Sequence, residues 1–222
     1  MREIVLDTET TGLDPDDGDR IVEIACIELV NHLPTGRIFH RYVNPQRPVS
    51  AAAHAIHGLD DAFLAQHPPF DAAAAEFLAF IGDATLVAHN AEFDLKFVNA
   101  ELKRLERPPF AGVVIDTLAL ARKRYPGAQA SLDALCRRFA IDLSARDKHG
   151  ARLDSELLAA VYLELVGGRQ PGLDLAALGN GETGAVAERS VRPPRPHAPS
   201  AEEEAAHAAF LGKIRQPIWN GI

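Results

Sequence analysis

The chain has 222 residues, of which 47% are hydrophobic and 24% charged, and its formal net charge is −8. This apolar content is enough to bury a full core, and no apolar run approaches the ~20 residues of a membrane-spanning helix. The two cysteines, Cys26 and Cys136, lie far apart in apolar contexts and are predicted to be buried thiols, which excludes a disulfide framework. The start of the chain leads directly into a strand pattern without a secretory signal, so we expect a cytoplasmic protein.

The charge is unevenly distributed along the chain. Residues 1–95 hold 5 Lys and Arg against 16 Asp and Glu, whereas residues 96–152 hold 12 against 6. The basic segment could line a phosphate track beside an acidic centre, although solvated helix faces explain such runs equally well. The candidates for this track are Arg122, Lys123, Arg124, Arg137, Arg138, Arg146, Lys148 and Arg152.

The first part of the chain is predicted to form three strands in an antiparallel meander. The nearly continuous apolar run Arg2–Asp7 predicts a central, buried strand, and the acidic segment Leu13–Asp19 predicts a loop. Strands are also predicted at Arg20–Leu29 and Arg37–Val43, with a turn at Pro34–Gly36 between them.

Helices and short strands alternate in the next part of the chain. Short strands are predicted at Thr85–His89 and Val113–Asp116. The predicted helices are Ala51–Ile56, Asp60–Ala65, Phe70–Ile81, Glu92–Leu105, Thr117–Arg124, Ser131–Ala140 and Asp154–Val166. A meander followed by this alternation predicts an α/β fold of the ribonuclease-H-like kind, with a mixed five-stranded sheet flanked by helices.

The composition changes after Gly168, which divides the chain into three predicted parts. Residues 1–168 form the globular domain, residues 169–199 form a flexible linker rich in Gly, Pro, Ala and Arg, and residues 200–222 contain a short helix. The helix is predicted from a capping box that begins at Ser200. Its apolar residues are too few to form a core, so we expect them to dock on another surface. These residues are Phe210, Leu211 and Ile214, followed by Ile218 and Trp219.

Four carboxylates in three short motifs predict a metal site. Asp7 and Glu9 are two residues apart on a strand and therefore project to one face, while Asp94 and Asp154 lie near the starts of two helices. Buried carboxylates are costly unless something positive compensates them. Carboxylate oxygens are the ligands that hard divalent cations prefer, so four of them suit two Mg²⁺ or Mn²⁺ ions and the two-metal hydrolysis of a phosphodiester.

The chemistry also requires a base, and His149 is the candidate. Imidazole has an ordinary pKa of about 6.5, so it can take a proton from the attacking water near neutral pH. His149 lies five residues before Asp154, in a glycine-containing loop that would let it reach the metals. The histidines without such a position, which we interpret as surface or structural residues, are His32, His40, His54 and His67. His89 begins one of the three motifs, and we also consider that it only supports the sheet.

The motifs together resemble a known enzyme family. The three segments Asp7–Gly12, His89–Asp94 and His149–Asp154 occur in order, and the similarity extends over about residues 1–168. Further matching segments are Val22–Ile24, Ile56–Leu59, Asp116–Arg122 and Ser131–Cys136. The chain resembles the DEDDh 3′–5′ exonucleases, and is most similar to the epsilon, or proofreading, subunits of bacterial DNA polymerase III.

The resemblance implies a function and a set of site residues. It implies a proofreading 3′–5′ DNA exonuclease (EC 3.1.11.-) that releases nucleoside 5′-monophosphates. It also implies that the chain is a subunit of a holoenzyme with DNA-directed DNA polymerase activity (EC 2.7.7.7). The implied metal ligands and catalytic carboxylates are Asp7, Glu9, Asp94 and Asp154, with His149 as the general base. The implied substrate contacts are Asp7, Glu9, Thr10, Thr11, Gly12, Leu13, His57, Asn90, Phe93 and Asp154. Some relatives carry a carboxylate five residues before His57, where this chain has Ala52, so one sugar or phosphate contact differs.

The resemblance also implies macromolecular partners. DNA 3′ ends, single-stranded or frayed, are the substrate, and the segment 200–222 would bind the DNA polymerase III alpha subunit through Phe210, Leu211, Ile214, Ile218 and Trp219. A sliding clamp is a further implied partner, which would bind through Gln170, Leu173 and Leu175. The implied location is the bacterial cytoplasm, at the nucleoid-associated replisome. Two alternatives stay open: an RNA-trimming DEDDh exoribonuclease, and a non-catalytic adaptor between clamp and polymerase.

Overall fold

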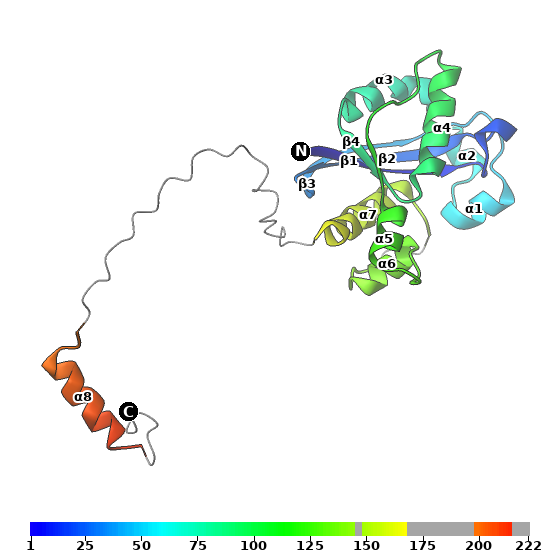
Figure 1. Ribbon diagram of the computed structural model, residues 1–222. Coiled ribbons are helices and arrows are strands. Elements are labelled where there is room, and N and C mark those ends of the chain that lie inside the picture. The colour runs from blue at the N-terminus through cyan, green and yellow to red at the C-terminus, as the bar shows by residue number, and fades with distance from the viewer. Residues whose placement is uncertain (145–147, 168–197, 215–222) are drawn as a thin grey trace. The chain divides into compact units, whose positions relative to one another are not determined.

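The computed structural model describes residues 1–144, 148–167 and 198–214 (Figure 1). The chain divides into two units, Met1–Leu173 and Asp174–Ile222. The predicted boundaries after residues 168 and 199 stay predictions. The predicted partner residues Gln170, Leu173, Leu175, Ile218 and Trp219, and the basic residue Arg146, lie outside the described residues.

The first unit is built on a mixed five-stranded sheet, as the sequence predicts. Its strands are β1 (Arg2–Thr10), β2 (Ile21–Val30), β3 (Leu33–Tyr42), β4 (Thr85–Ala88) and β5 (Val114–Asp116), in the order β3-β2-β1-β4-β5. The first three strands form the predicted antiparallel meander. β4 and β5 add to β1 in parallel, which requires the crossover helices that the later part of the chain supplies.

The turn between β2 and β3 lies elsewhere than predicted. Asn31 and His32 take positive φ angles of 52° and 68°, the conformation that a two-residue hairpin turn requires. Gly36, which was expected in the turn, instead lies within β3 with φ 86°, opposite an irregularity in the register of β2. The prediction of a turn at Pro34–Gly36 is therefore wrong, because the hairpin closes on Asn31 and His32.

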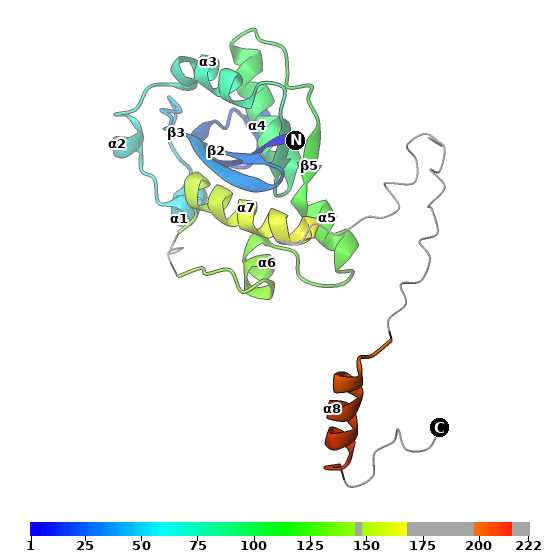
Figure 2. The same ribbon diagram turned by 90° about the vertical axis from the view of Figure 1, so that its left-hand side faces the viewer.

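Helices cover both faces of the sheet. They are α1 (Ala51–His57), α2 (Asp61–Leu64), α3 (Phe70–Ile81), α4 (Ala91–Arg104), α5 (Thr117–Arg124), α6 (Leu132–Arg138) and α7 (Ala151–Val166), and the short 3₁₀ helix η1 spans Pro15–Asp17. Both ribbon views place α3 and α4 on one face and α7 on the other, with α5 and α6 beside α7 (Figures 1 and 2). None of the helices that the structure describes is both long and apolar enough to span a membrane.

The alternation of side chains along β1 directs its carboxylates to one face. Ile4 and Leu6 belong to the core cluster under α3 and α4, whereas Val5 packs with Leu158 of α7. Because side chains alternate along a strand, Asp7 and Glu9 continue the face of Val5, toward α7. The strand extends three residues beyond its predicted end, so both carboxylates lie within β1.

The second unit contains one described helix, α8 (Ala201–Leu211). The predicted capping box is present, since the Ser200 hydroxyl accepts from the Glu203 N–H and the Glu203 carboxylate accepts from the Ser200 N–H. Phe210 is 59% exposed and Ile214 is 37% exposed. The described part of this unit therefore exposes one large apolar residue in the last turn of α8 and a second one three residues after its end.

Candidate functional site

Residues from two distant parts of the chain come together at the carboxyl end of β1. Glu9 of β1, Asp154 of α7 and His149 each place a potential ligand atom within 4.8 Å of the others. Glu9 is 9% exposed and Asp154 is 3% exposed, whereas the His149 side chain is 49% exposed. The cluster therefore has a buried acidic floor and an imidazole on its solvent side.

Asp7 and Asp94 belong to the same acidic cluster. Burial raises the pKa of Asp7 well above its usual value, and the nearby charges of Asp94, Glu9 and Asp154 raise this pKa further. Burial also raises the pKa of Asp94 to about 7, although the Thr8 hydroxyl, which donates to Asp94 Oδ1 at 2.7 Å, acts in the opposite direction. The other three predicted carboxylates thus all lie within electrostatic reach of Asp7.

The donor set fits divalent cations. Four carboxylates and one imidazole offer mainly oxygen ligands, the type that Mg²⁺ and Mn²⁺ prefer. Mutual repulsion destabilises the ionised form of Asp7, and a cation among these groups would remove that repulsion. The arrangement is therefore chemically suited to metal binding.

His149 is held at the edge of the cluster by two contacts. Its Nδ1 lies 3.1 Å from Asp154 Oδ2, and its backbone N–H donates to the Ile56 carbonyl oxygen at 3.2 Å. The first contact orients the imidazole, and the second fixes its loop to the end of α1. His149 therefore has a defined position although its side chain is half exposed.

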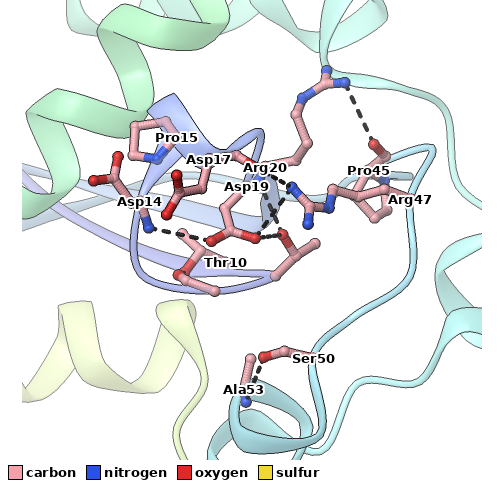
Figure 3. Close-up of polar contacts among 12 residues, drawn as sticks. Thr10, Asp14, Pro15, Asp17, Asp19, Arg20, Pro45, Arg47, Ser50 and Ala53 are labelled. Carbon is pink, nitrogen blue, oxygen red and sulfur yellow. Dashed lines mark hydrogen bonds and ion pairs between the residues drawn. The ribbon is translucent and has the colours of Figure 1, made fainter.

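The segment after β1 forms a wall beside the cluster. Asp19 accepts hydrogen bonds from the Thr11 hydroxyl (2.8 Å) and the Asp14 N–H (3.2 Å), and it pairs with Arg47 at 3.2 Å (Figure 3). A Cβ atom at Gly12 would lie 2.2 Å from Asp19 Oδ2. A side chain at position 12 would therefore displace the Asp19 carboxylate from these contacts.

His57 supports the wall from α1. Its Nδ1 accepts from the Leu59 N–H at 3.0 Å, so Nε2 carries the proton and faces the Thr10 carbonyl oxygen at 3.3 Å. Burial lowers the pKa of His57, which favours this neutral form. Both ring nitrogens are thus used by the backbone in this structure, and the predicted contact of His57 with substrate stays a prediction.

Two pockets flank the carboxylates. The first, of about 220 Å³, is lined by Thr8, Glu9, Thr10, Gly12, Leu13, Ser50, Ala52, Ala53, Ile56, His57 and Phe93. The second, of about 570 Å³, is lined by Asp7, His89, Asn90, Leu118, Arg122, Ser131, Leu132, His149 and Asp154. Phe93 therefore lines the first pocket, together with residues of the wall, whereas Asn90 and the basic residue Arg122 line the second pocket. The His89 Nδ1 is 2.9 Å from the Thr117 hydroxyl, which agrees with a supporting role.

Sequence reasoning gave Glu23 no role in the site and interpreted His40 as a surface or structural residue. Glu23 lies directly opposite Glu9 in the β1–β2 register and is 3% exposed. Its Oε1 accepts from His40 Nε2 at 2.7 Å, so His40 is next to the site and not simply a surface residue. The available signal was a glutamate inside the otherwise apolar run of a buried strand.

The chain is similar to a known family over most of its length. A family model described as Exonuclease matches residues 4–162. The DNA polymerase III subunit epsilon of Rickettsia conorii (strain Malish 7) is 46% identical over 222 residues, which cover 96% of both proteins. The protein of the same name from Escherichia coli (strain K12) is 42% identical over 231 residues, which cover 97% of this chain and 94% of that one.

Solved structures show the same fold. Exonuclease X in complex with 5′ overhanging duplex DNA aligns with a TM-score of 0.60 and 29% identity, over 74% of this chain and 90% of that chain. The nuclease domain of 3′hExo, a DEDDh family member bound to rAMP, aligns with a TM-score of 0.65 and 20% identity, over 74% of this chain and 91% of that chain. The family model and the sequence relatives show that the chain belongs to the exonuclease family, among the epsilon subunits of DNA polymerase III.

Proposed function

We propose that the chain is the proofreading 3′–5′ exonuclease of a replicative DNA polymerase. The observation that carries this proposal is the cluster of Glu9, Asp154 and the half-exposed His149, with the charges of Glu9, Asp154 and Asp94 acting on the buried Asp7 beside it. A buried acidic cluster of this kind has no use in a non-catalytic adaptor, because it destabilises the fold that contains it. The family and the relatives named above support the same conclusion.

The four carboxylates are proposed to hold two divalent cations, Mg²⁺ or Mn²⁺. Bound there, such ions supply an activated water and stabilise the charge that develops on the phosphodiester. The chain's own contribution is to fix the ligands. The Thr8 hydroxyl orients the Asp94 carboxylate at 2.7 Å, and the first turn of α7 presents Asp154.

His149 is proposed to accept the proton of the attacking water. Its exposed imidazole can meet water, and its contact with Asp154 Oδ2 keeps the ring at the edge of the acidic cluster. Asp154 also stabilises the imidazolium that forms when the proton arrives, because a carboxylate favours the charged form of its partner. His149 thereby removes the proton from the reacting centre to solvent.

The first pocket is proposed to hold the 3′-terminal nucleotide. Thr10, Gly12 and Leu13 line it, with the buried Thr11 between them in the chain, and Leu13, which is 81% exposed, offers an apolar surface for a base. Phe93 lies across the same pocket. On the second side of the carboxylates, Arg122 and Asn90 offer donors for the phosphates of the remaining strand.

The substrate can be tested directly with matched DNA and RNA oligomers. We expect faster Mg²⁺-dependent shortening of single-stranded DNA than of RNA of the same sequence, with nucleoside 5′-monophosphates as the product. A duplex with a mispaired 3′ end should be shortened faster than a fully paired one, because a frayed end is less costly to unstack. The control is the same reaction with a chelator. A strong preference for RNA would favour the exoribonuclease alternative.

The second unit is proposed to bind the DNA polymerase III alpha subunit. The exposed Phe210 and Ile214 of the α8 region support this role, together with Leu211. Ile218 and Trp219 are proposed to continue this surface, and Gln170, Leu173 and Leu175 to bind a sliding clamp. The location proposed for the protein is accordingly the bacterial cytoplasm, at the replisome on the nucleoid.

Removal of residues 200–222 should separate hydrolysis from polymerase binding. We expect the truncated chain to degrade single-stranded DNA at the wild-type rate, because every proposed catalytic residue lies in the first unit. Binding to the purified alpha subunit, measured by gel filtration or calorimetry, should be lost. Phe210→Ala should weaken binding, whereas His207→Ala, an exposed change on the same helix, should not. Unchanged binding by the truncated chain would contradict this docking assignment.

A further inference from the structure

Glu23 is a buried carboxylate beside the proposed site. It pairs directly with Glu9 across strands β1 and β2, so both side chains project to the face that α7 covers. Glu23 is 3% exposed. A carboxylate at such a position must be compensated by neighbouring donors or charges.

Both oxygens of Glu23 already have partners. The His40 Nε2–H donates to Oε1 at 2.7 Å, and the backbone N–H of Ala151 donates to Oε2 at 3.1 Å. His40 belongs to β3, so Glu23 connects β3 with the first residue of α7. Because each oxygen accepts from a different element, Glu23 is suited to hold other groups in place.

The contact with Ala151 compensates for a weak helix start. The N-cap of α7 is Gly150, which has no side chain to satisfy the free N–H groups of the first turn. The Glu23 carboxylate supplies an acceptor there, and its negative charge is favourable at the amino end of a 16-residue helix. A residue 128 positions away in the sequence thus caps α7.

The capped turn carries two residues of the proposed site. The Asp154 N–H donates to the Gly150 carbonyl oxygen at 2.9 Å, so Asp154 moves with this turn. His149 directly precedes Gly150, and its Nδ1 contacts Asp154 Oδ2. Any displacement of the start of α7 would therefore move both side chains relative to Asp7 and Glu9.

We propose that Glu23, held by His40, is a positioning residue that fixes the start of α7 and thereby places Asp154 and His149 for the reaction. This inference rests on the proposed exonuclease function for its kinetic consequence. Its structural consequence, a fixed first turn of α7, is independent of the reaction.

Three variants of the full chain test the proposal. Glu23→Ala removes both contacts. Glu23→Gln keeps an oxygen for the Ala151 N–H and an amide that can donate to His40 in its other tautomer, so it removes the charge alone. Glu28→Ala is the matched control, because Glu28 is also a buried glutamate of β2, 4% exposed, but pairs with Arg2 and Arg37.

The variants should differ in kinetics, metal binding and amide exchange. Glu23→Ala should lower kcat on single-stranded DNA by about 10- to 100-fold with little change in KM, since loss of a residue that orients metal ligands typically has an effect of this size. Its affinity for Mn²⁺, measured by calorimetry, should fall, and the Ala151 amide hydrogen should exchange faster. Glu23→Gln should stay within about threefold of the wild type in kcat and Mn²⁺ affinity. Glu28→Ala should lose thermal stability but keep wild-type kcat, Mn²⁺ affinity and Ala151 exchange.

Several outcomes would overturn the proposal. Wild-type kcat and Mn²⁺ affinity in folded Glu23→Ala would show that Glu23 positions nothing that the reaction needs. Equal losses in Glu28→Ala would show a general effect of removing a buried glutamate. Loss of Mn²⁺ binding in Glu23→Gln would make Glu23 a ligand. If the wild-type chain does not degrade DNA, the proposed function fails, whereas Mn²⁺ binding and Ala151 exchange still decide the positioning role.

Discussion

Replacement of Asp7 by alanine should abolish metal-dependent hydrolysis. We expect the rate on single-stranded DNA to fall by about 1,000-fold or more, which corresponds to about 4 kcal/mol of activation free energy. The reason is that the charges of Asp94, Glu9 and Asp154 all act on Asp7, so its loss removes a proposed ligand that lies near each of the other three. The measurement is the initial rate of 5′-monophosphate release at saturating Mg²⁺, together with calorimetric titration of Mn²⁺ into the variant.

Two further variants are compared with Asp7→Ala, one as a control and one as a test of the base. Asp83→Ala removes an exposed carboxylate in the loop before β4 and should leave both the rate and Mn²⁺ binding unchanged. His149→Ala should lower turnover near neutral pH but retain most Mn²⁺ binding if His149 acts as the base. Loss of both properties in His149→Ala would instead identify the imidazole as a ligand, which its proximity to Glu9 and Asp154 permits. Full activity of folded Asp7→Ala would falsify the metal assignment.

The metal-free protein should lose stability as the pH rises from about 4 to about 7. Burial raises the pKa of Asp94 from 3.8 to about 7 in the folded chain, and the pKa of Asp7 is raised in the same direction. Well below pH 4 Asp94 is protonated in both the folded and the unfolded chain, so it has no effect on stability. Above pH 7 Asp94 is ionised in both states, and the folded state carries the full cost of this buried charge.

The size of this loss of stability follows from the rise in the pKa of Asp94. A rise of about three pKa units at Asp94 corresponds to about 4 kcal/mol in the free energy of unfolding, which is an upper limit because the neighbouring carboxylates titrate together. Urea unfolding in the presence of a chelator, at pH 5 and pH 8, measures the change. Addition of Mg²⁺ or Mn²⁺ at pH 8 should restore stability, because ions that bind only the folded state favour it.

Asp94→Asn isolates the contribution of this one group. Asparagine keeps the acceptor for the Thr8 hydroxyl but cannot ionise, so the variant should be more stable than the wild type at pH 8 without metal and less dependent on pH. It should also lose activity. A more stable but inactive variant would show that the Asp94 carboxylate is needed for the reaction although it lowers the stability of the metal-free fold. Equal pH dependence in the variant and the wild type would contradict the assignment of this effect to Asp94.

Local signals in the sequence were enough for most elements of the fold. The helices Phe70–Ile81 and Thr117–Arg124 begin and end at the predicted residues, because apolar spacing and the residues at their ends specify them. The capping box at Ser200 was equally local. The order of strands and helices predicted the mixed sheet, since parallel strands need helical crossovers between them.

Interactions between distant residues decided what the local signals could not. Helix α7 begins at Ala151, three residues before its predicted start at Asp154, because Glu23 of β2 accepts from the Ala151 N–H. For the same reason Asp154 lies inside the first turn and is buried. The pattern of residues 149–154 contains no information about a carboxylate on another strand, so only the folded chain sets this boundary.

The candidate site also combines features that the sequence predicted with features that only the folded chain decides. The sequence predicted which acids, together with His149, would form the site, because the chemistry of a divalent cation restricts its ligands to a few side chains. Their closeness, the raised pKa of Asp94 and the roles of Glu23 and His40 were not readable from it. Electric fields and hydrogen bonds depend on distances in space, and those distances exist only after β1, β2, α4 and α7 have packed together.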